Sequence, residues 1–129
     1  MTDVVITHMH MDHIGGLLVD KVKNRLRPDV RIHVSATEVD FWATPDFTQT
    51  TMPTPVPDVL RSTAQQFMDA FHNQLKTFED EYEVAPGVVV KLTGGHTPGG
   101  TTFTGPALTW PNAYQHDAMS GTQSGILIL

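Results

Sequence analysis

Residues 8–16 are His-Met-His-Met-Asp-His-Ile-Gly-Gly, which places three histidines and one aspartate within six residues. The run before them, Asp3-Val-Val-Ile-Thr7, is apolar and β-branched, which is typical of a short buried strand. Residues two apart at the end of a strand still point the same way. His8 and His10 can therefore converge on one cation.

Asp12 and His13 stand one turn further along the chain and can face a second cation nearby. Neutral imidazole and carboxylate groups bind zinc at about 2.0–2.2 Å. Gly15 and Gly16 let the backbone turn tightly beside such a site. The alternative is that these histidines bind no metal. That is the better explanation for a lone histidine, but it fits this dense arrangement less well. A purification tag is a poorer explanation, because tags do not interleave methionine and aspartate in this way.

The rest of the chain predicts a mixture of helices and strands. Ser35 and Glu38 have the spacing of a capping box, which predicts a helix over residues 36–43. A longer helix is expected to begin at Asp58, because an apolar stripe with steps of three or four residues continues to Phe78. Strands are expected over residues 30–34, 82–84, 88–92 and 101–104.

Four more histidines lie further along the chain, and three of them fall in predicted elements or turns. His96 is carried by a glycine-rich turn, Thr-Gly-Gly-His-Thr-Pro-Gly-Gly, at residues 93–100. His33 lies in a predicted strand and is expected to face solvent, whereas His72 flanks the stripe of the long helix and is expected to be partly buried. Residues 44–57 hold four prolines and are expected to form an irregular surface loop.

The composition excludes several classes of protein. The chain has 129 residues, of which 40% are hydrophobic and 17% charged, enough for one domain with a modest core. It contains no cysteine, which rules out disulfides and thiolate zinc sites. The net charge of −6 and the pI near 5.5 argue against nucleic acid as a partner. No apolar run reaches the roughly 18 residues of a membrane span, and no secretory signal is recognisable, so we expect a cytoplasmic location without membrane attachment.

Two motifs carry a resemblance to a known family. Residues 7–16, THMHMDHIGG, resemble the metal-binding signature of the metallo-β-lactamase superfamily, and residues 94–100, GGHTPGG, resemble its second metal motif. Within the superfamily, residues 31–42, RIHVSATEVDFW, and residues 83–103, EVAPGVVVKLTGGHTPGGTTF, are most similar to the methyl parathion hydrolase and lactonase-like branch. The resemblance extends over about residues 3–104.

The resemblance implies an αββα sandwich with metals at the sheet edges. His8, His10 and His96 would hold a first metal, and Asp12 and His13 would belong to a second. The family's nucleophile is a hydroxide that bridges the metals, and Asp12 would also be catalytic, orienting that hydroxide or passing its proton to a leaving group. Zinc is the expected cofactor, as one or two ions; manganese, iron or cobalt would also suit ligands without thiolate.

The chain departs from the family pattern at both ends, so an incomplete α+β domain is expected over residues 1–104, with a divergent tail over residues 105–129. Gly100 replaces the second histidine of the family's usual GHTPGH motif. Asp117 follows His96 by 21 residues, near the expected position of the family's bridging aspartate, and is a candidate ligand. His116 is a candidate for the family's final histidine. The alternative for both is an exposed polar pair in a loop.

These features predict a metal-dependent hydrolase that acts on a small ester, lactone, β-lactam or phosphotriester, with the proline-containing loop and the long helix as walls of the substrate pocket. One alternative is a fragment that binds metal with little or no catalysis. Another is a binding or assembly module that uses exposed sheet edges. Apolar strands at residues 3–7 and 88–92 and the apolar end at residues 126–129 predict a homodimer or higher oligomer.

Overall fold

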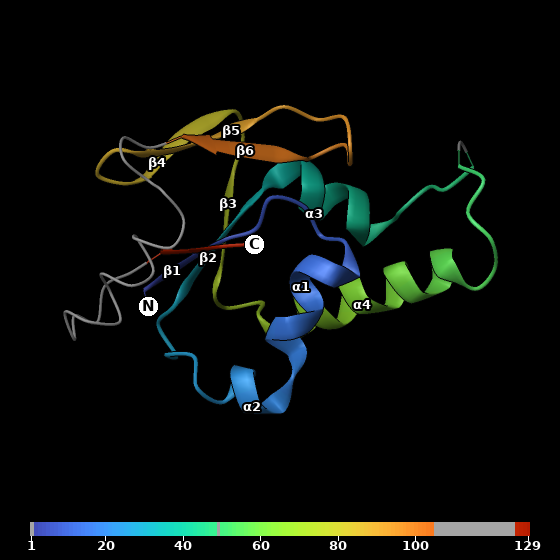
Figure 1. Cartoon of the computed structure of the whole chain (residues 1–129), viewed down its shortest axis with the longest axis horizontal. Coiled ribbons are helices and arrows are strands. Elements are labelled where there is room, and N and C mark those ends of the chain that lie inside the picture. Colours follow the sequence, from blue (N-terminus) through green and yellow to red (C-terminus); the bar gives the residue numbers. More distant parts are fainter. Residues whose placement is uncertain (1, 49, 105–125) are drawn as a thin grey trace.

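The computed structural model describes residues 2–48, 50–104 and 126–129 (Figure 1). Its elements are, in chain order, β1 (Asp3–Val5), α1 (Met11–Leu18), α2 (Asp20–Lys23), β2 (Arg31–Ser35), α3 (Ala36–Ala43), α4 (Val56–Ala70), β3 (Leu75–Phe78), β4 (Glu81–Ala85), β5 (Val88–Leu92), β6 (Thr101–Thr104) and β7 (Ile126–Ile128). None of the helices in these ranges is long and apolar enough to span a membrane.

The first sheet is parallel and has the strand order β3-β2-β1-β7. In its register, Val4 of β1 stands opposite Ile32 of β2 and Leu127 of β7. The apolar end of the chain therefore adds a strand to the chain's own sheet. This pairing continues beyond the strands, since Thr7 donates its backbone N–H to the carbonyl oxygen of Leu129 at 2.8 Å.

The second sheet is antiparallel, with the order β4-β5-β6. Figure 1 shows it on one side of β1 and β2, with α1, α2 and α4 on the other side. Val4 of β1 belongs to the core shared with the helices, which includes Ile14, Trp42 and Phe67. Val5 belongs to the core between the two sheets, with Val90. Because alternate residues of this segment enter two cores, Val4, Val5 and the following Ile6 are all apolar and buried, whereas Asp3 begins the strand as a buried carboxylate.

The long helix is shorter than its apolar stripe predicts. It spans Val56–Ala70, so Asp58 lies in its first turn, where it pairs with Arg61 at 2.8 Å, rather than at the cap. Leu75–Phe78 is strand β3 and pairs with β2, so the prediction of helix through Phe78 was wrong. As strand residues, Leu75 packs against the helix-side core and Phe78 enters the core between the sheets. The apolar residues at 75 and 78 continue the helical spacing of α4, but pairing with β2 makes this segment a strand.

Two predictions about histidine exposure were wrong. His33 was expected to face solvent but is 1% exposed, because its Nε2 contacts Asp3 and its Nδ1 contacts the hydroxyl of Tyr82. His72 was expected to be partly buried but is exposed, because the chain leaves α4 and turns toward β3 at this point.

Candidate metal centre

The first metal motif begins where β1 ends. Met9 is fully buried and donates its backbone N–H to Oε1 of Glu38 at 2.7 Å, which fixes the segment between its two neighbouring histidines. The carbonyl of Thr7 accepts from the N–H of Thr101 at 2.9 Å. His10 is the N-cap residue of α1. The segment is thus held from both sides while His8 and His10 remain partly accessible.

The second motif forms a tight loop between β5 and β6. Gly94 and Gly95 adopt φ values of +68° and +99°, which only glycine adopts readily. The N–H groups of Thr93 and Gly94 both donate to the carbonyl of Gly100 at 2.9 Å, which closes the loop. The exposed His96 is thereby carried to the side of the first motif.

The three histidines His8, His10 and His96 form a compact triangle. Their ring centroids lie 4.6–4.9 Å apart. Each ring offers a nitrogen, and these nitrogens all lie within 4.8 Å of one another. Three imidazoles in this arrangement fit a tetrahedral zinc site that keeps one position open. We call this group the histidine triangle.

The protonation of these rings also suits a cation. Burial, followed by repulsion from His13, His10 and His96, lowers the pKa of His8 from 6.5 to about 4. Burial and the proximity of His96 lower the pKa of His10 in the same direction. At neutral pH both rings are therefore uncharged and carry a free lone pair. The hydroxyl of Thr7 lies 3.0 Å from Nδ1 of His8, and a ring held at Nδ1 presents Nε2 to a metal.

Asp12 and His13 lie beside the triangle, in the first turn of α1. The ring of His13 is 3.9 Å from the ring of His8, centroid to centroid. Its Nε2 is 3.7 Å from Oδ2 of Asp12, whose side chain is 75% exposed. Within the described residues, the three-ligand group consists of the histidine triangle without these two. Asp117 and His116 lie outside the described residues.

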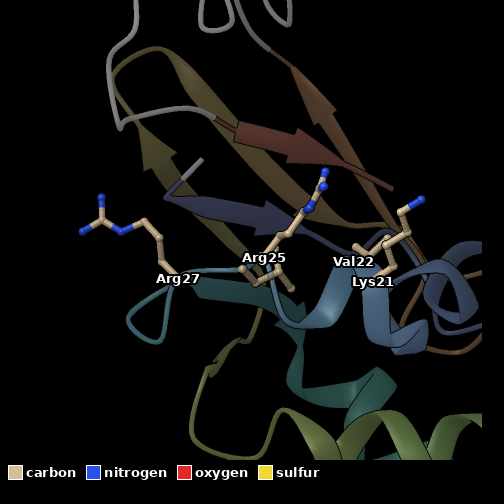
Figure 2. Close-up of a pocket in the computed structure, with 5 residues that line it drawn as sticks. Lys21, Val22, Arg25 and Arg27 are labelled. Atoms are coloured by element: carbon tan, nitrogen blue, oxygen red, sulfur yellow. The ribbon is translucent and has the colours of Figure 1, made fainter.

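A cavity of about 490 Å³ adjoins the triangle. It is lined by Thr7, His8, Thr93, Gly94, His96, Gly100, Thr101, Thr102 and Phe103. The described residues of the loop 44–57 and of α4, which were predicted as walls of the substrate pocket, are not among those that line this cavity. A separate cavity of about 420 Å³ is lined by Lys21, Val22, Arg25, Leu26 and Arg27. Figure 2 shows the labelled Lys21 and Val22 on α2 and Arg25 and Arg27 on the segment after it. No histidine is among the described residues that line this second cavity.

The model of the metallo-β-lactamase superfamily matches residues 2–105. That range contains both histidine motifs and most of both sheets. The chain belongs to this superfamily. No curated protein matches it significantly.

Solved structures of the superfamily resemble the chain over part of their length. AidC, a dizinc quorum-quenching lactonase solved in complex with a product, is 28% identical with a TM-score of 0.67, over 84% of this chain and 38% of AidC. The hydrolase AbOPH is 27% identical with a TM-score of 0.59, over 80% of this chain and 36% of its own. A probable metal-dependent hydrolase from Staphylococcus aureus, 22% identical with a TM-score of 0.55, shares the fold. The chain thus spans 33–38% of the length of these structures.

Glu38 is the residue near the site that sequence analysis misinterpreted. Its spacing from Ser35 predicted a capping box, and Ser35 does cap α3 by accepting from the N–H of Glu38 at 3.1 Å. The side chain of Glu38 is instead fully buried against both metal motifs. One signal was available: Glu38 lies four residues before the large apolar Trp42, so the two side chains share a helix face.

Proposed function

We propose that this chain is the metal-binding part of a hydrolase that acts on small esters, lactones, β-lactams or phosphotriesters. The observation that carries the proposal is the histidine triangle, with three nitrogens within 4.8 Å of one another. A zinc ion bound there supplies Lewis acidity and lowers the pKa of a coordinated water to about 7. Imidazole binds a metal as a neutral ligand, so the three rings would hold such an ion without cancelling its charge.

The remaining polar groups of the site are assigned to proton transfer and to a second metal. The carboxylate of Asp12 is exposed beside His13, so it is placed to accept a proton at the mouth of the site or to bind a second ion. We assign Asp12 and His13 to that second position. Asp117 and His116 stay candidate ligands to it.

The substrate class is inferred from the cavity beside His8 and His96. Among the described residues, its lining consists of the two histidines, threonines, glycines and the half-exposed Phe103, with no Lys, Arg, Asp or Glu. Such a wall suits a small neutral substrate rather than a charged one. The likeness to a lactonase and to the hydrolase AbOPH supports a lactone or another neutral ester-like bond as the target.

The proposal is tested by removing and restoring metal. The chain is stripped with a chelator, reloaded with zinc or cobalt, and assayed against an aryl ester, a lactone and a phosphotriester. Activity that disappears on stripping and returns on reloading supports a metallohydrolase. Metal binding without turnover of any of the three supports the second candidate, a metal-binding fragment, which is favoured by the partial coverage of the relatives. Equal activity with and without metal would contradict both.

Two further parts of the proposal concern the oligomeric state and the cellular location of the protein. We expect a homodimer or higher oligomer, because the strands at the edges of the two sheets leave backbone groups without a strand partner within the described residues. A cytoplasmic location stays a prediction.

A further inference from the structure

Glu38 is a fully buried carboxylate on α3 that accepts four hydrogen bonds. Its Oε1 accepts from the N–H of Met9 at 2.7 Å and from Nε1 of Trp42 at 2.8 Å. Its Oε2 accepts from the hydroxyl of Thr97 at 2.7 Å and from the N–H of Gly99 at 3.0 Å. Every lone-pair direction of a buried charge thus has a donor, as its burial requires.

The two oxygens divide their partners between the two metal motifs. Met9 stands between His8 and His10, and it bonds to Oε1. Thr97 directly follows His96, and it bonds to Oε2 together with Gly99. One rigid, planar group therefore fixes the backbone of both histidine-bearing segments relative to each other.

The role requires a carboxylate rather than any polar side chain. All four partners present hydrogens in this arrangement, and only a carboxylate accepts on both oxygens without carrying a hydrogen of its own. A glutamine would turn its NH₂ group toward one of the two motifs. The helix does not need Glu38 as a cap, because Ser35 caps α3.

The glycine loop also packs directly on α3. A Cβ atom at Gly99 would overlap the backbone of Glu38, so the loop approaches as closely as glycine permits. The carbonyl of Gly99 accepts from the hydroxyls of Ser35 at 2.7 Å and Thr101 at 3.1 Å. The second motif is thus seated on the helix that carries Glu38.

We infer that Glu38 is a positioning residue that sets the geometry of the metal site by holding the two histidine motifs in register. This inference rests on the proposed metal centre. The negative charge of Glu38 also acts electrostatically at His8 and His10, which favours the binding of a cation beside these two rings. Mutation of residues that orient metal ligands by hydrogen bonds typically lowers metal affinity by about 10–100-fold.

The first experiment compares Glu38→Gln with the matched control Asp3→Asn in the full chain. Asp3 is also a buried carboxylate with several donors, but it lies at the opposite end of β1 from the histidines. Cobalt titration followed by absorption is expected to show affinity about 10–100-fold lower in Glu38→Gln, with an altered visible spectrum. Asp3→Asn is expected to retain the cobalt affinity and spectrum of the wild type.

A second variant covers the case in which Glu38→Gln does not fold. Thr97→Val keeps the side-chain shape and removes one donor to Oε2, so it is expected to weaken cobalt binding by a smaller factor. Wild-type cobalt affinity in Thr97→Val and in any folded Glu38→Gln would overturn the inference.

A wild-type chain that binds no cobalt would overturn the proposed function instead. The inference is then decided in the metal-free protein by amide hydrogen exchange. We expect the N–H groups of Met9 and Gly99 to exchange faster in Glu38→Gln, or in Thr97→Val for Gly99, than in Asp3→Asn. Equal rates would show that Glu38 does not hold the two segments.

Discussion

Asp3 and His33 are joined by a short buried contact, in which Nε2 of His33 lies 2.7 Å from Oδ1 of Asp3. Nδ1 of the same ring lies 3.0 Å from the hydroxyl of Tyr82. Asp3 and His33 belong to the parallel sheet, whereas Tyr82 belongs to β4 of the other sheet. These three side chains therefore tie the two sheets together at the end of β1 remote from the histidine triangle.

The first prediction is that this contact makes stability depend on pH. Burial acts to raise the pKa of Asp3, but hydrogen bonds from Arg31, Thr2 and His33 outweigh it and hold the pKa below its ordinary value of 3.8. A carboxylate with a lowered pKa stabilises the fold fully above its unfolded value, and this contribution is lost as the pH falls through the folded value. Urea unfolding of the wild type should therefore give a falling free energy below about pH 4.

Asp3→Asn supplies the control for that measurement. At neutral pH we expect the variant to lose about 1–3 kcal/mol of unfolding free energy, because an NH₂ group replaces one of the two oxygens that accept from Thr2, Arg31 and the buried His33. The difference between wild type and variant should shrink at acid pH. A difference that stayed constant from neutral pH to pH 2 would show that ionisation of Asp3 does not stabilise the fold.

The second prediction concerns the ligands of the histidine triangle. His8→Ala, His10→Ala and His96→Ala should each abolish tight zinc binding and most hydrolytic activity, because two imidazoles remain where three surrounded the ion. His72→Ala is the matched control, since that histidine is exposed and does not belong to the triangle. Dialysis against zinc followed by metal analysis checks the outcome. Full activity in a triple variant of the three ligands would refute the metallohydrolase.

The third prediction concerns metal stoichiometry. The histidine triangle supplies three ligands, whereas the neighbouring position has Asp12 and His13 among the described residues. A site with fewer protein ligands keeps more waters and binds its ion less tightly. At low zinc concentration we expect closer to one ion per chain than two. Two ions that both resist dialysis would mean that further residues, such as His116 or Asp117, complete the second site.

The fourth prediction is assembly into a homodimer or higher oligomer. Pairing with β7 covers one edge of β1, but β3 and β7 become the outer strands of the described sheet. Large apolar side chains such as Met11, Val59 and Phe103 are also at least 41% exposed. Light scattering at micromolar concentration should give a mass of two chains or more. A stable, active monomer would show that the sheet edges are sufficiently protected within one chain.

Local sequence signals predicted the elements whose stability is local. Helix α3 and strands β5 and β6 have the predicted bounds, because the Ser35 cap and the turn at Pro86-Gly87 act over a few residues. The histidine triangle was also predicted, although its closure depends on a loop more than 80 residues away, because the resemblance linked the two motifs.

The errors came from long-range packing. The last residues of the predicted apolar stripe, 75–78, have a spacing that fits both a helix and a strand. Only their pairing with β2 decides that they form a strand. His33 was expected to face solvent because its partners Asp3 and Tyr82 are remote in sequence. Glu38 was read as part of a capping box for the same reason, since three of its four donors lie 29, 59 and 61 residues away.

The pairing of β7 with β1 couples the last strand to the first metal motif. Its three residues are only half-buried, and strands this short open easily in local fluctuations. When β7 detaches, Thr7 loses the carbonyl of Leu129 that accepts its N–H, and the next residue is His8. Fraying at one end of the chain would thus loosen a metal ligand near the other, and bound metal would in turn slow that fraying.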